Sequence, residues 1–174
     1  DAAAPAGKRP HEMMRELRQM QDRLARGDLD AVTKQRALIE QITAEFEKAD
    51  DEVWKDARNA RSVLAFVLSG GDPKVLRGLL LRGQPTGVDT NLARGVHAFV
   101  SNRKGEALEH FANVNPLDLE PALAGQIALA QAELLARSDL GRALQKLAEA
   151  RLLAPGTLIE EASLRRQISI LSSQ

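Results

Sequence analysis

A sequence pattern typical of a helical hairpin occurs twice in this chain, and the two copies are about 36 residues apart. Small and large residues, apolar except for Gln131, return at matching places in the two copies. The first copy carries Gly95, Phe99, Ala107, Leu108 and Phe111, and the second carries Gln131, Leu135, Ala143, Leu144 and Leu147. A helix pair of this size cannot bury its apolar face alone, so successive pairs stack and share a core. The repeat therefore predicts an array of packed helices.

The arrangement resembles the tetratricopeptide repeat, in which a small residue lets two helices approach closely and a proline ends the unit. The residues expected to make the repeat contacts are Ala107, Phe111, Ala143, Leu147, Ala150 and Pro155. Repeat arrays of this kind present extended surfaces to other proteins. The pattern thus predicts a scaffold and does not name a partner.

The apolar spacing along the whole chain predicts an all-α fold of about nine helices, arranged as an irregular array of helical hairpins (a tetratricopeptide-like α-solenoid). Residues 1–9 are expected to be a flexible tail and residues 10–174 a single domain. Asp30 is expected to cap the second helix, and Asp72-Pro73 the fourth. Residues 83–88 form either an ordinary loop between repeats or a boundary between two layers, and we prefer the loop.

The composition limits the core and the classes of partner. With 174 residues the chain should bury roughly 70% of its unfolded surface. It has four Phe, one Trp and no Tyr, so Ala and Leu must fill the core. Trp54 is expected to be a core residue, or else an interface anchor. The 24 basic and 24 acidic residues balance, which argues against a nucleic-acid partner. No apolar run is long enough to span a bilayer.

No group of residues has the spacing of a catalytic, cofactor or metal site. The histidines His11, His97 and His110 lack a second ligand at metal-binding spacing, and the chain has no Cys. Phosphate-binding glycine motifs and nucleophile motifs are absent from the sequence. The acidic groups Asp50-Asp51-Glu52 and Glu160-Glu161 fall at expected helix starts, where capping explains them. We therefore predict a protein that is not an enzyme and has no cofactor.

Three segments carry a more specific resemblance. They are ARLLAPGTLIEEASLRR (150–166), LRQMQDR (17–23) and KQRALI (34–39). Together they resemble the MotC family of periplasmic motility proteins. The resemblance implies an exported protein that supports flagellar rotation by contacting the periplasmic part of the stator protein MotB. It also implies an association with the chaperone MotE, and it supplies no catalytic residue.

The ends of the chain fit that resemblance. The start at Asp1, followed by small residues, resembles the stretch that follows a cleaved export signal. The last helix keeps an apolar face up to its end, so we expect a longer protein or a covering surface. Two alternatives remain open: a cytoplasmic repeat adaptor that binds peptides or proteins, and a small helical enzyme with an unrecognised pocket.

Overall fold

The computed structural model describes residues 10–49, 56–81 and 90–173. Within these ranges every regular element is a helix, which confirms the predicted all-α class, and the number of helices is close to the nine expected. The chain divides into two compact units, the first formed by residues 1–66 and 71–88 and the second by residues 67–70 and 89–174. No described helix is both long and apolar enough to cross a membrane.

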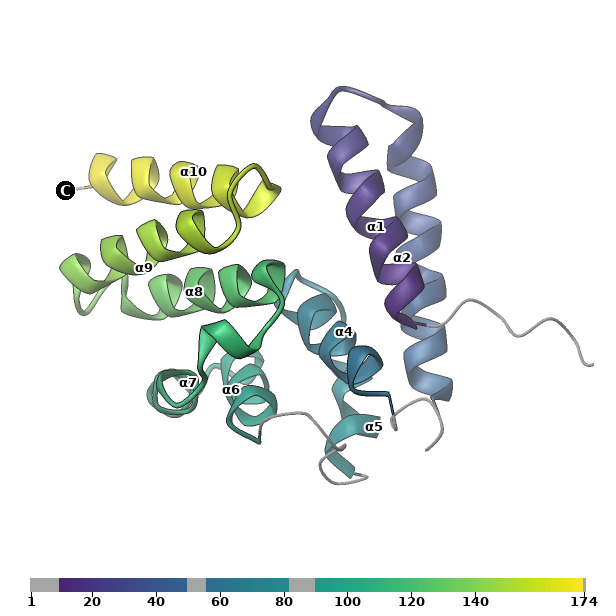
Figure 1. Cartoon of the computed structure of the whole chain (residues 1–174), viewed down its shortest axis with the longest axis horizontal. Helices are drawn as coiled ribbons and strands as arrows, with labels where there is room; N and C mark the ends of the chain where they lie inside the picture. The colour runs from purple at the N-terminus through teal and green to yellow at the C-terminus, as the bar shows by residue number, and fades with distance from the viewer. Residues whose placement is uncertain (1–9, 50–55, 82–89, 174) are drawn as a thin grey trace, which may run out of the picture. The chain divides into compact units, whose positions relative to one another are not determined.

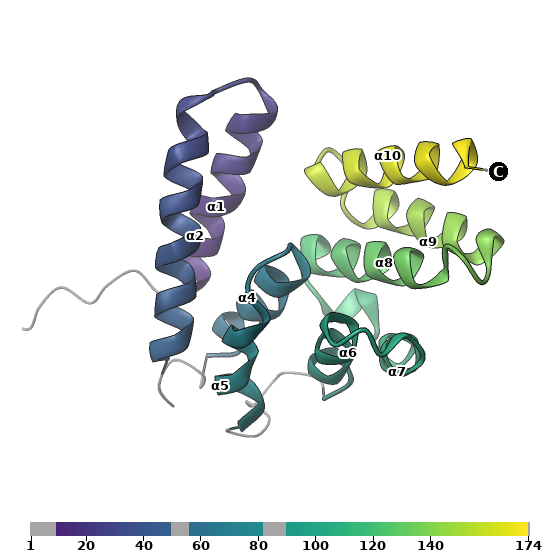
Figure 2. The same cartoon turned by 180° about the vertical axis from the view of Figure 1, so that it is seen from behind.

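The first unit is built around an antiparallel pair of helices, α1 (Pro10–Ala25) and α2 (Asp30–Lys48), which lie side by side in Figures 1 and 2. The pair is followed by α4 (Ala57–Leu68), whose last two residues belong to the second unit, then by the 3-10 turn η1 (Pro73–Val75) and α5 (Leu76–Leu81). The rings of Phe46 and Phe66 pack at a centroid distance of 6.0 Å. His11 Nδ1 lies 3.0 Å from Oδ1 of the buried Asn59, which joins α1 to α4.

The second unit holds both copies of the repeated hairpin. The first copy pairs α6 (Thr90–Val100) with α7 (Lys104–Ala112), and the second pairs α8 (Pro121–Leu135) with α9 (Leu140–Leu153). A connection with the 3-10 turn η2 (Pro116–Asp118) joins them, and α10 (Leu158–Ser172) packs on α9 and α8. Both cartoon views show α8, α9 and α10 as successive neighbours (Figures 1 and 2).

The residues observed at the helix N-termini can be compared with the predicted N-caps. Asp72 caps η1 as expected, because its side chain accepts a hydrogen bond from the Lys74 N–H and Pro73 occupies the first turn. The prediction for Asp30 is wrong. The N-cap of α2 is Leu29, without a side-chain bond, and the carboxylate of Asp28 accepts from the Asp30 N–H at 3.2 Å. Asp28 lies two residues earlier and its side chain can fold back over the turn, so it takes the capping role.

The acidic start of α10 follows the expected pattern. Thr157 caps the helix by accepting from the Ile159 N–H, and Glu160 accepts from the Gly156 N–H at 2.6 Å. The Thr157 bond uses a donor that a helix N-terminus otherwise leaves unpaired, and the Glu160 bond fixes the residue before the cap. The tail 1–9, the acidic group 50–52, Trp54 and the segment 83–88 lie outside the described residues.

Candidate binding groove

The residues expected to make the repeat contacts lie on two helices and one loop of the second unit. Ala107 and Phe111 are buried on α7, and Ala143, Leu147 and Ala150 are buried on α9. Pro155 is exposed in the turn between α9 and α10. Leu147 packs in a cluster with Ala132 of α8 and Ile170 of α10.

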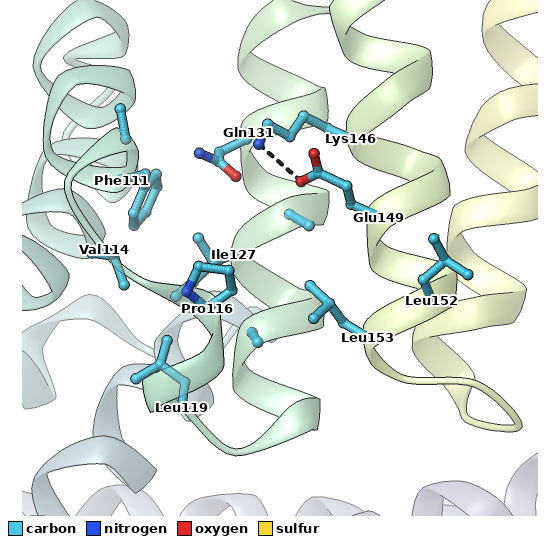
Figure 3. A pocket seen from close by; sticks show the side chains of 13 residues that line it. Phe111, Val114, Pro116, Leu119, Ile127, Gln131, Lys146, Glu149, Leu152 and Leu153 are labelled. Carbon is cyan, nitrogen blue, oxygen red and sulfur yellow. Dashed lines mark hydrogen bonds and ion pairs between the residues drawn. The ribbon is translucent and has the colours of Figure 1, made fainter.

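A groove runs between the α7 end of the first hairpin and α9 of the second, with α8 as its floor (Figure 3). Its cavity volume is about 420 Å³. The floor consists of Ala124, Ile127, Ala128 and Gln131, which recur at helical spacing on one face of α8. The volume falls within the roughly 300–1,000 Å³ typical of ligand clefts.

The walls of the groove are mainly apolar. Phe111 closes one side, Leu119 of the connecting segment lies near one end, and Leu153 of α9 closes the other side. At the rim, Leu152 exposes 81% of its surface, so a large apolar side chain stands in water beside an apolar cavity. Exposed apolar surface next to a cleft is characteristic of a binding site.

Gln131 is the polar exception on the floor. It exposes only 9% of its surface, and its side chain extends from α8 toward α7 beside Phe111 (Figure 3). None of the described residues forms a hydrogen bond with the side-chain amide of Gln131. The carboxamide offers two N–H donors and one carbonyl acceptor to an occupant of the groove.

Two charged residues line the groove, and they form an ion pair with each other. Lys146 Nζ lies 2.9 Å from Glu149 Oε2, one turn apart on α9 (Figure 3). Their opposite charges cancel, so the lining carries no net charge. The groove is consequently suited to an uncharged occupant.

A second apolar surface lies on α10. Leu164, Ile168 and Leu171 expose 46%, 66% and 50% of their surfaces, and their spacing places them on one helix face. A different part of α10 holds it to α9. The buried Ser163 Oγ donates to the Leu147 carbonyl at 2.6 Å and accepts from Arg151 Nη1 at 2.9 Å.

Each of the three histidines contacts a polar side chain of its own unit, and His11 does so with Asn59. His97 Nδ1 is 2.9 Å from an Arg103 nitrogen, and His110 Nδ1 is 3.1 Å from Asn91 Oδ1. In the part of the chain that the structure describes, no three His, Cys, Asp or Glu residues are grouped so that they could hold a metal ion.

Sequence reasoning identified Gln131 only as the counterpart of Gly95 in the repeat, and it missed the groove. One signal was available. Gln131 is a polar residue in a helix that is otherwise rich in Ala and Leu, at the register where the first copy has glycine. A polar residue on the buried face of such a helix is unusual enough to indicate a function.

The whole chain, residues 1–174, matches the family model described as "Chemotaxis protein MotC". A relative is the chemotaxis protein MotC of Rhizobium meliloti (strain 1021), which is 29% identical over 161 residues. That match covers 92% of this chain and 37% of the relative, so the chain spans little more than a third of the relative's length. No solved structure matches the chain. Both names point to chemotaxis and flagellar motility, and the chain belongs to the MotC family.

Proposed function

We propose that this chain is part of a periplasmic, non-enzymatic scaffold that supports flagellar rotation by binding the periplasmic part of the stator protein MotB. Membership of the MotC family is the observation that carries the proposal. The resemblance to that family also implies the chaperone MotE as an associated protein. The apolar groove and the exposed face of α10 support a binding role, because they offer surface for a protein partner.

Such a scaffold would act through preferential binding. A protein that binds one conformation of MotB more tightly than another shifts MotB toward the preferred conformation. The shift is limited by the difference in affinity, and a tenfold preference corresponds to about 1.4 kcal/mol. No chemical step is needed for this effect, so a helical surface is sufficient.

The direct test is a binding measurement between this chain and the purified periplasmic region of MotB, together with swimming assays after deletion of the gene. We expect saturable binding and loss of swimming. Absence of binding together with normal swimming would contradict the proposal.

Location is tested separately by fractionating cells that express the full-length protein. We expect it in the periplasmic fraction. Recovery in the cytoplasm would favour the alternative function, a cytoplasmic adaptor that binds peptides or proteins through the same helical surface.

A further inference from the structure

We propose that the groove on α8 binds an extended, uncharged segment of a partner protein, with one large apolar side chain in the cavity and one peptide group hydrogen-bonded to Gln131. The identity of the partner protein that supplies this segment rests on the proposed function. The recognition chemistry rests on the groove itself.

The cavity favours an apolar side chain. Phe111, Ile127 and Leu153 enclose a space of about 420 Å³, while Ala124 and Ala128 keep its floor open. The side chain of Leu152 at the rim is 81% exposed and can cover an occupant once it is seated. Burial of a leucine- or phenylalanine-sized side chain there removes apolar surface of both partners from water.

Gln131 favours an extended backbone over a helix. In a helix the peptide groups bond to one another, so a docked helix has no free peptide group to offer in its middle. An extended segment has unpaired N–H and C=O groups along its length. The carboxamide of Gln131 provides both a donor and an acceptor, and it is nine-tenths buried at the floor of the groove.

The lining offers no net charge that would attract an ionic ligand. Lys146 and Glu149 are paired at 2.9 Å, so a negatively charged ligand meets Glu149 and a positively charged one meets Lys146. Either would have to compete with an existing ion pair and give up part of its own hydration. An uncharged segment meets neither cost.

The probe is a set of blocked pentapeptides of alanine and glycine that differ only at the central residue, which is Leu, Phe, Ala, Lys or Asp. Backbone amide resonances of isotope-labelled protein are followed during titration. We expect the Leu and Phe peptides to shift resonances of Ile127, Gln131 and Leu153, with the Ala, Lys and Asp peptides at least tenfold weaker. Equal binding of all five, or shifts confined to other surfaces, would overturn the inference.

Variants then separate the two parts of the recognition. Gln131→Leu keeps the bulk of the side chain and removes the carboxamide, and we expect about tenfold weaker binding of the Leu peptide. Leu152→Ser changes an exposed position and should weaken binding roughly fivefold without affecting folding. The matched control is Leu171→Ser, an exposed leucine of α10, which should leave peptide binding unchanged. Unchanged binding by both groove variants would refute the proposed site.

The same variants test the groove inference separately from the proposal that MotB is the partner. Peptide binding without MotB binding supports the groove and contradicts the MotB proposal. Binding of MotB that neither groove variant weakens, with no peptide shifts, contradicts the groove and leaves the MotB proposal standing.

Discussion

Gly95 of α6 lies against the ring of Phe111 of α7 so closely that a Cβ atom at position 95 would be 2.7 Å from Cδ1 of the ring. Phe111 exposes only 2% of its surface and its ring forms one wall of the groove, so a Cβ atom at position 95 would force this ring to shift. The contact sets how closely the two helices of the first hairpin approach. Glycine is needed there because it has no side chain, although glycine disfavours the helix itself.

The first prediction concerns this contact. Gly95→Ala should destabilise the second unit by about 1–2 kcal/mol, because overpacking outweighs the improved helix propensity. Chemical denaturation followed by circular dichroism measures the change. The control is Gly105→Ala in α7, where a Cβ atom would meet nothing within 4 Å. It should raise stability by about 0.5–1 kcal/mol, and destabilisation by both substitutions would argue against a steric cause.

The sequence predicts the helices and their buried faces, such as the face of α7 that carries Phe111, but it does not predict the groove or the cap of α2. Apolar spacing placed the helices and the residues that face inward, since burial follows helical periodicity directly. The groove depends on how far α7 stands from α9. That separation follows from how α7 and α9 pack on α8 and from the connection that contains η2, and this connection has no periodic pattern in the sequence. The cap of α2 was missed for a similar reason, because Asp28 and Asp30 are chemically equivalent and only the backbone selects between them.

The second prediction tests the packing of the second hairpin. Ala143 of α9 is fully buried, so Ala143→Glu forces a carboxylate into the contact between helices. We expect a loss of at least about 3 kcal/mol, or failure to fold. Gln145→Glu introduces the same charge at an exposed position of the same helix and should change stability by less than about 0.5 kcal/mol. A melting temperature unaffected by Ala143→Glu would contradict the observed packing of α9.

The third prediction concerns the attachment of α10. Ser163 Oγ links Arg151 and the Leu147 carbonyl, and it is completely buried. Ser163→Ala should cost about 1–2 kcal/mol, because it leaves a buried carbonyl without this donor. Ser169→Ala, an exposed change on the same helix, should be neutral or slightly stabilising. Faster hydrogen exchange confined to α10 in Ser163→Ala would locate the effect, and equal stability of the two variants would contradict it.

The last prediction is a pH dependence in the first unit. Hydrogen bonds from the Arg58 guanidinium lower the pKa of Asp56 from 3.8 to about 2, and the Arg58 N–H also donates to Asp56. Because the folded pKa is the lower one, the ionised carboxylate stabilises the fold above pH 3.8, and this contribution disappears as the pH falls toward about 2.

Asp56→Asn keeps an oxygen that can accept from the backbone and removes only the charge. At neutral pH we expect it to be less stable than the wild type by under about 1 kcal/mol, since the pair is partly exposed. The difference should shrink as the pH falls from 3.8 to about 2, and urea denaturation across this range measures it. Arg58→Gln removes the other partner and should reduce the same pH dependence. A stability difference that stays constant down to pH 2 would show that the ion pair is not its cause.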